Sequence, residues 1–180
     1  MKIKVLIIVA IILVGCANNQ KKNDVANANY DEESEVIDSQ DATLEVYNFN
    51  SLEKFLNKKD DKTYIINFWA TWCKPCIKEL PHFEKINAKY AKQNVEVILV
   101  SLDFPHLYET KLKPFIVEKK LRSKVIALDD VDMNTWIPKV DETWSGAIPA
   151  TIIYRNDTRK FFEGSFTYEA LEAEVKQFLN

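Results

Sequence analysis

A pair of cysteines at the junction of a predicted strand and a predicted helix constrains the fold of this chain most strongly. Residues 64–69 are aromatic and β-branched with almost no charge, which predicts a central strand covered on both faces. From Cys73 onward, apolar side chains recur every three or four residues, which predicts an amphipathic helix that ends near Ala91. Cys73 and Cys76 therefore lie where the strand passes into the helix.

A second strand of the buried type is predicted at residues 95–100. A helix of this length between two such strands favours a parallel βαβ unit with a right-handed crossover. Upstream, we expect a short strand at 44–47 and then a helix capped by Asn50, with Glu53 returning the capping bond. Together these elements predict the α/β class.

The second half of the chain has a looser pattern of turns and apolar residues, which predicts its elements only in outline. In order, we expect a helix at 112–120, a strand at 125–128, an irregular stretch at 129–146, a hairpin of strands at 151–154 and 160–163, and a helix at 167–179. The sequence contains no internal repeat.

The N-terminus predicts export. Lys2 and Lys4 precede an apolar run over residues 5–14, which is too short to span a bilayer. The run ends in Leu-Val-Gly-Cys at Cys16, which resembles the bacterial lipobox. We therefore expect a lipoprotein signal peptide at residues 1–15 and a lipid on Cys16 that anchors the protein to a membrane without crossing it. An ordinary signal peptide or a tail anchor with an incidental cysteine is the alternative.

Composition predicts where the folded part lies. Residues 17–41 are polar and lack apolar periodicity, so we expect residues 16–41 to be the lipidated cysteine and a flexible tether. Residues 42–180 then form one folded domain, which faces the periplasm or the exterior in the cell envelope. The formal net charge is −3, and the sequence has neither a cluster of Lys and Arg nor a Gly-rich phosphate loop. We therefore expect no nucleic acid or nucleotide partner.

The position of the cysteine pair predicts thiol chemistry. Unpaired backbone N–H groups and the helix dipole stabilise a thiolate at the start of a helix, which lowers the pKa of the first cysteine. Cys73 is thus the predicted nucleophile. Cys76 lies one turn further along, more buried, and close enough to form a disulfide with Cys73 once a mixed disulfide has formed. It is the predicted resolving thiol.

A Cys-x-x-Cys pair can also serve other functions. A structural zinc site needs four N or S ligands, and only His82 and His106 could add to the pair, so we expect no metal and no cofactor. A thiol peroxidase would require the motif Pro-x-x-x-Thr/Ser-x-x-Cys before its reactive cysteine. This chain has Ile66 at the position of the proline and Ala70 at the position of the threonine or serine. A purely structural disulfide stays open as an alternative. So does copper delivery without catalysis, although such proteins space their cysteines one residue wider and add a histidine.

A longer motif surrounds the cysteines. The segment Phe-Trp-Ala-Thr-Trp-Cys-Lys-Pro-Cys at residues 68–76 resembles the active site of thioredoxins, and the wider pattern resembles the membrane-associated TlpA/ResA-like family. Glu-Leu-Pro at 79–81 has the spacing of that family, and residues 146–151 look like the loop that carries the cis-proline of the thioredoxin fold. The resemblance covers residues 42–180. It implies a thioredoxin fold, with a central mixed sheet flanked by helices and an insertion before the cis-proline loop.

The resemblance also implies roles for side chains around Cys73. Pro149 would form a cis peptide bond beside Cys73 and keep metals and stray thiols away. The backbone of Ile148 would pair with an extended substrate segment, and Trp72 would offer a platform for partner proteins. These three residues are the predicted substrate-binding positions.

Glu79 is the predicted acid or base for Cys76. It follows Cys76 by one helical turn, so it could transfer the proton of that thiol. Thioredoxins place a buried Asp on the preceding strand for this task, whereas this chain has Asn67, which cannot titrate. A solvated helix glutamate is the alternative.

The resemblance implies a protein-disulfide reductase of the cytochrome c maturation type, and we expect it to be a monomer. Its substrates would be apocytochrome c or other disulfide-containing envelope proteins, and its electrons would come from a membrane thiol transporter. The same fold can also oxidise or isomerise disulfides, so these directions remain alternatives.

Overall fold

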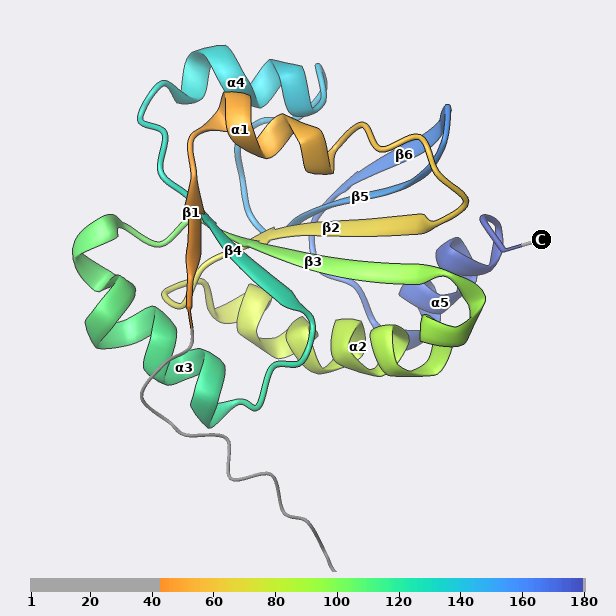
Figure 1. The fold of residues 1–180 in the computed structure, drawn as a ribbon, viewed down its shortest axis with the longest axis horizontal. Helices are drawn as coiled ribbons and strands as arrows, with labels where there is room; N and C mark the ends of the chain where they lie inside the picture. The colour runs from red at the N-terminus through yellow and green to blue at the C-terminus, as the bar shows by residue number, and fades with distance from the viewer. Residues whose placement is uncertain (1–42, 180) are drawn as a thin grey trace, which may run out of the picture. The chain divides into compact units, whose positions relative to one another are not determined.

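A six-stranded mixed sheet forms the centre of residues 43–179, which are the part of the chain that the computed structural model describes (Figure 1). The strands lie in the order β1-β4-β3-β2-β5-β6, with parallel pairing from β1 to β2 and antiparallel pairing of β5 with β2 and β6. Their bounds are β1 Glu45–Tyr47, β2 Thr63–Trp69, β3 Val95–Ser101, β4 Lys124–Leu128, β5 Ala150–Arg155 and β6 Thr158–Glu163. The α/β class and the parallel βαβ unit are confirmed.

Helices cover both faces of the sheet. The helices α1 and α4 lie on one face, and α2, α3 and α5 lie on the other (Figure 1). Their bounds are α1 Phe49–Leu52, α2 Lys74–Tyr90, α3 Lys113–Glu118, α4 Met133–Val140 and α5 Tyr168–Lys176. Short 3-10 turns lie at Glu53–Phe55, Ala91–Gln93 and Pro105–Leu107, and a π-helical segment lies at Tyr108–Leu112. Among residues 43–179, no helix is both long and apolar enough to cross a bilayer.

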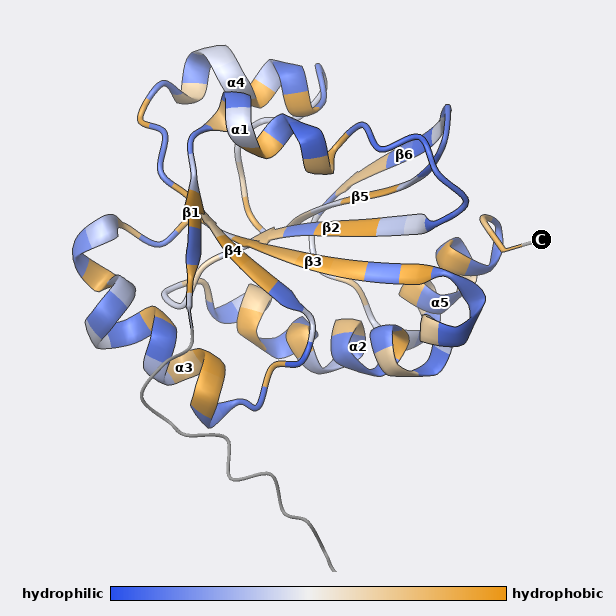
Figure 2. Cartoon of the chain, in the orientation of Figure 1, coloured by the Kyte–Doolittle hydropathy of each residue, from blue (hydrophilic) through white to orange (hydrophobic). Residues whose placement is uncertain are grey.

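Strand β2 forms the middle of the core. All seven of its residues are buried, and the central strands are mainly hydrophobic in Figure 2. Because side chains alternate along a strand, Ile65 and Trp69 pack toward α2 and α5, whereas Ile66 and Phe68 pack toward α1 and α4. Asn67 shares the face of Trp69, so β2 directs this amide toward α2. The fully buried strand carries the chain to the cysteine pair, as predicted.

The cap of α1 differs from the prediction. Asn48, not Asn50, caps the helix, because its side-chain oxygen accepts a hydrogen bond of 3.0 Å from the backbone of Ser51. The helix must start early enough to bury Phe49, which leaves Asn50 exposed inside it. The N-cap of α1 therefore lies two residues earlier than the sequence pattern predicts.

Two boundaries in the second half also differ. The helix expected at 112–120 is preceded by the π-helical segment, which buries Tyr108 and Leu112, and α3 itself ends at Glu118. The stretch expected to be irregular contains α4. This helix is short, includes a proline, and buries only Trp136 and Val140, so its periodicity is too brief to recognise from the sequence.

The β5–β6 hairpin and the final helix match the prediction, and α5 is capped by the side chain of Thr167. The predicted signal peptide, the lipid site at Cys16 and the tether to residue 41 lie outside the described residues.

Candidate active site

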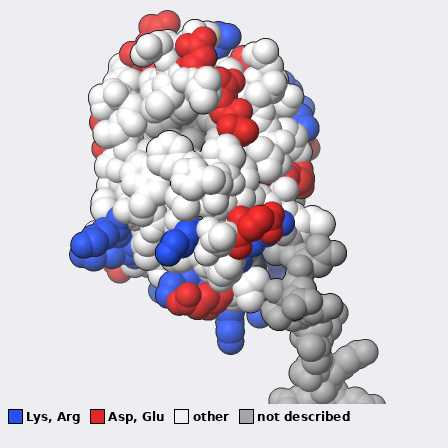
Figure 3. Space-filling view, turned by 90° about the vertical axis from the view of Figure 1, so that its left-hand side faces the viewer, with Lys and Arg blue, Asp and Glu red and all other residues white. Residues whose placement is uncertain are grey.

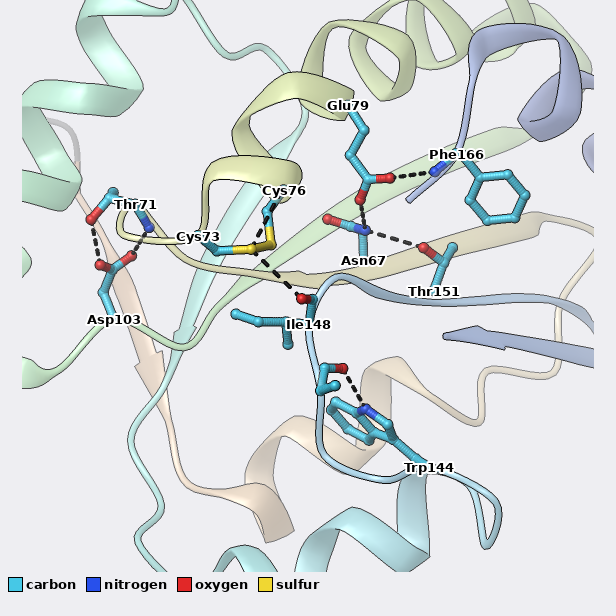
Figure 4. The surroundings of a disulfide bond; sticks show 11 residues. Asn67, Thr71, Cys73, Cys76, Glu79, Asp103, Trp144, Ile148, Thr151 and Phe166 are labelled. Atoms are coloured by element: carbon cyan, nitrogen blue, oxygen red, sulfur yellow. Dashed lines mark hydrogen bonds between the residues drawn. A yellow bond between two sulfur atoms is a disulfide. The ribbon is translucent and has the colours of Figure 1, made fainter. Parts of the chain in front are cut away.

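A disulfide bond between Cys73 and Cys76 lies at the N-terminus of α2 (Figure 4). Cys73 is the N-cap residue of this helix, and its sulfur accepts a hydrogen bond of 3.3 Å from the backbone N–H of Cys76. Cys73 is 6% exposed and Cys76 is fully buried. An incoming thiol or disulfide therefore meets Cys73 first.

The start of α2 favours a thiolate at Cys73 in the reduced protein. The helix runs for 17 residues from Lys74, so the positive end of its dipole points at the Cys73 sulfur. The Cys76 N–H already points at that sulfur, and it would donate more strongly to an anion than to a disulfide sulfur. Both effects stabilise the thiolate that attacks a disulfide in thiol-disulfide exchange.

The loop before β5 brings a proline beside the disulfide. The Ile148–Pro149 peptide bond is cis, as the resemblance implied, and the carbonyl oxygen of Ile148 lies 3.7 Å from the Cys73 sulfur. The disulfide sulfur carries no proton, so this is a contact in the oxidised state that a Cys73 thiol could convert into a hydrogen bond. Pro149 is buried and Ile148 is half-buried, so the loop forms one wall beside Cys73.

Trp144 fixes this loop, a role that the sequence analysis missed. Its indole N–H donates to the carbonyl of Ala147 at 2.8 Å, just before the cis peptide bond. The Trp144 ring is buried and lies 4.9 Å from the Phe68 ring, measured between centroids. The loop that carries Pro149 is thus tied to the core beneath β2.

Glu79 is a buried carboxyl group, 1% exposed, one helical turn past Cys76. One of its oxygens accepts from the Asn67 side chain at 3.0 Å, and the other accepts from the backbone of Phe166 at 2.7 Å (Figure 4). Burial raises the pKa of Glu79 to about 7, although these two hydrogen bonds lower it in part. The alternative of a solvated glutamate is therefore wrong.

Asn67 connects Glu79 to the sheet. Its side-chain nitrogen also donates to the hydroxyl oxygen of Thr151 on β5 at 3.1 Å. Its side-chain oxygen is buried and has no hydrogen-bond partner among the described residues. The amide therefore presents donors to Glu79 and Thr151 and keeps an acceptor free, which a buried water could occupy.

Asp103 supports the loop that leads into Cys73, and the sequence analysis also missed this residue. Its buried carboxylate accepts from the backbone N–H of Thr71 at 2.9 Å and from the Thr71 hydroxyl at 2.5 Å. It also accepts from the hydroxyl of Ser101 at 2.8 Å, which joins the end of β3 to the active-site loop. The only signal in the sequence is a carboxylate two residues after a buried strand.

Trp72 is 54% exposed beside Cys73, whereas its neighbour Trp69 is buried. A platform for partner proteins would need this exposure.

Among residues 43–179, no group of three or more His, Cys, Asp or Glu could hold a metal ion.

Comparisons with known proteins give the family and the fold. The thiol-disulfide oxidoreductase ResA of Bacillus cereus is 31% identical over 119 residues, which make up 64% of this chain and 63% of the relative. ResA of Oceanobacillus iheyensis is 32% identical over 125 residues, or 65% of this chain and 57% of the relative. This chain thus spans less than two thirds of the length of these curated relatives.

Two solved structures share the fold. A thioredoxin-family thiol:disulfide interchange protein from Chlorobium tepidum has a TM-score of 0.53 at 19% identity and covers 67% of this chain and 81% of its own. A secreted thiol-disulfide isomerase from Corynebacterium glutamicum has a TM-score of 0.57 at 19% identity, and the match covers 71% of this chain and 74% of the isomerase. These likenesses confirm the thioredoxin-like fold. Since the AhpC/TSA family matches residues 36–159, more than half of the chain, the protein belongs to the AhpC/TSA family of thioredoxin-like proteins.

Proposed function

We propose that this protein is a thiol-disulfide oxidoreductase that reduces disulfide bonds of other proteins through Cys73 and Cys76. The observation that carries this proposal is the asymmetry of the pair: Cys73 caps α2 and is the more exposed sulfur, whereas Cys76 is fully buried. A purely structural disulfide would need neither the helix start nor the cis-proline wall. The names of the ResA relatives support the same activity.

The proposed reaction has two exchange steps. The Cys73 thiolate attacks one sulfur of a substrate disulfide, so a bond forms to Cys73 while the substrate S–S bond breaks and its other sulfur leaves as a thiolate. Cys76 then loses its proton and attacks the Cys73 sulfur, which closes the Cys73–Cys76 disulfide and releases the second substrate thiol. Two electrons pass to the substrate, and the protein ends in its disulfide form.

Glu79 is the proposed proton acceptor for Cys76. A carboxyl group with a pKa of about 7 holds and releases a proton in the pH range where the enzyme must work. Asn67 and the Phe166 N–H hold the carboxyl group in place by hydrogen bonds. Neither donor carries a charge, so the carboxyl group can exist in both states.

The partners and the location are part of the proposal. We propose that the protein is anchored by a lipid on Cys16 and acts as a monomer in the cell envelope, outside the cytoplasmic membrane. Its substrates are disulfide-containing envelope proteins, with apocytochrome c as the type that the TlpA/ResA resemblance implies. A membrane thiol donor would return the Cys73–Cys76 pair to its reduced form after each cycle.

Variants of Cys73 and Cys16 provide the test. The reduced full chain is mixed with a disulfide-bonded protein, and substrate thiols are counted by alkylation and mass spectrometry. We expect Cys73→Ser to abolish reduction, and Cys16→Ser to retain it while losing lipid labelling and membrane attachment. Reduction that persists in Cys73→Ser would contradict the proposed activity, whereas Cys16→Ser that stays on the membrane would contradict only the anchor.

A further inference from the structure

A groove of about 420 Å³ opens beside the active site, at the ends of the parallel strands. Its walls come from the loops that follow β2, β3 and β4 and from the cis-proline loop. The wall residues nearest the cysteine pair are Trp72 and Ile148, and the far wall includes Trp136. Loops at the carboxyl ends of parallel strands are the usual place for ligands in α/β sheets.

Exposed apolar side chains gather at this groove. Four of the six large apolar residues that are exposed within residues 43–179 line it: Trp72, Phe104, Val131 and Met133, at 54%, 57%, 95% and 46% exposure. A single exposed apolar side chain is ordinary, but a group of them around one hollow marks a binding surface. Figure 3 shows the side of the molecule that these loops form, where a largely uncharged surface is hollowed and acidic groups lie beside the hollow.

The charged residues that line the groove are all acidic. Its lining includes Asp103, Asp129 and Asp130 and no Lys or Arg. Asp103 binds the active-site loop, and Asp130 accepts backbone N–H groups from Phe49 and Asp132. The exposed carboxylate of Asp129, by contrast, has no hydrogen-bond or salt-bridge partner within the described part of the chain. Asp129 is therefore free to bind a cation.

Given the proposed function, we propose that this groove selects substrates by binding a segment with apolar side chains and a lysine or arginine close to the reacting cysteine. A substrate held in a mixed disulfide at Cys73 lies beside both Trp72 and the Ile148 carbonyl, which is 3.7 Å from the Cys73 sulfur. Its chain therefore continues directly into the groove. The apolar walls would hold its apolar side chains, and Asp129 would attract its cation. The acidic rim disfavours an anionic lipid surface as the occupant.

The test uses the reduced full chain and synthetic peptides whose single cysteine is joined to 4-thiopyridine. Attack by Cys73 on the peptide sulfur releases thiopyridone, which absorbs light, and Cys76 then displaces the peptide thiol. Each peptide carries leucines and places either lysine or glutamate two or four residues to one side of the cysteine. Rates are divided by that of the neutral disulfide 4,4'-dithiodipyridine, measured with the same protein.

For at least one of the two spacings from the cysteine, we expect the lysine peptide to react about fivefold faster at low salt than the matching glutamate peptide. This difference in rate should disappear at 1 M salt. Asp129→Lys should invert the preference. Asp61→Lys makes the same charge change in the loop before β2, at the opposite end of that strand from Cys73, and should leave the preference unchanged.

The outcomes separate the two proposals. Failure to reduce 4,4'-dithiodipyridine would overturn the proposed function itself. Normal reduction with equal rates for all peptide twins would overturn only the selective groove. A dimer in analytical ultracentrifugation together with no peptide preference would assign the groove to a second copy of the chain. Preferential binding of the reduced protein to anionic vesicles through the residues that line the groove would assign it to lipid. Either result would overturn the inference.

Discussion

The carboxyl group of Glu79 lies 3.0 Å from the side-chain nitrogen of Asn67, and both side chains are buried between α2 and the sheet. A titratable acid is thus held beside a neutral amide, without an ion pair among the described residues. Burial can then raise the pKa of Glu79 with no cation to oppose it.

The first prediction concerns stability and pH. The folded-state pKa of Glu79 is about 7 against an ordinary value of 4.5, so between these two pH values the unfolded chain loses a proton that the folded protein keeps. Unfolding is therefore increasingly favoured as pH rises through this window, by about 3 kcal/mol in total. Below about pH 4.5 the folded protein keeps the full stabilisation that comes from the raised pKa of Glu79. Above about pH 7 this stabilisation is lost, and Glu79 causes no further change in the free energy of unfolding.

Glu79→Gln should remove this part of the pH dependence, because a glutamine side chain does not titrate. In denaturant unfolding of the disulfide form, we expect the wild type to lose stability relative to the variant as pH rises from about 4.5 to 7. A constant offset between the two remains, because the glutamine NH2 group cannot accept both of the hydrogen bonds that Asn67 and the Phe166 N–H donate to Glu79. Glu169→Gln, at an exposed position on α5, serves as the matched control. Parallel pH curves for wild type and Glu79→Gln would show that Glu79 keeps an ordinary pKa.

The second prediction concerns the proton of Cys76. Glu79→Gln should slow release of the substrate from its mixed disulfide about 10²-fold near neutral pH, since a glutamine cannot accept the thiol proton. The initial attack by Cys73 should change much less. Stopped-flow kinetics with a fluorescent substrate separates the two steps, and an unchanged pH profile for release would assign Glu79 a structural role only.

The third prediction concerns the support of the active-site loop. Thr71→Val removes a hydroxyl that donates to the buried Asp103 carboxylate at 2.5 Å, so we expect a loss of about 1.5–3 kcal/mol in the free energy of unfolding. Thr143→Val removes an equally short bond, to Asp141, at an exposed turn and should cost less than about 0.5 kcal/mol. Equal losses in the two variants would mean that burial of Asp103 does not strengthen its bonds.

The fourth prediction assigns the two sulfurs. Cys76→Ser should accumulate stable mixed disulfides with envelope proteins, because Cys73 can attack but nothing resolves the product. Cys73→Ser should accumulate none, since Cys76 is fully buried. Non-reducing gels of cell envelopes distinguish the variants, and equal trapping by both would contradict the assignment of nucleophile and resolving thiol.

Local sequence patterns predicted the parts of the fold that depend on neighbouring residues. The buried strand β2 is apolar almost throughout, the helix after Cys73 has apolar residues every three or four positions, and two short strands flank a turn in the β5–β6 hairpin, so one segment alone reveals each element. The cis bond at Pro149 was predicted only through the family resemblance. The helix α4 escaped prediction because tertiary packing of Trp136 and Val140, not a long pattern, stabilises it.

The surroundings of the site depended on contacts between distant segments, and these a single sequence does not reveal. Glu79 is buried because Asn67 and Phe166, 12 positions before it and 87 after it, supply its hydrogen bonds. Asp103 meets Thr71 across 32 positions. Residue types suggested the chemistry of Cys73, Cys76 and Glu79, but only the folded chain reveals what holds them in place.

In the proposed function, Cys73 and Cys76 form a reversible redox pair that donates electrons to other proteins. The most direct test is the equilibrium reduction potential of this pair in the full chain, measured by titration with thiol-disulfide buffers and mass spectrometry of the alkylated protein. We predict a two-electron couple near the roughly −270 mV of thioredoxin. A potential near the roughly −120 mV of a strong oxidant would contradict the reductase direction, and a disulfide that fails to cycle would contradict the redox function altogether.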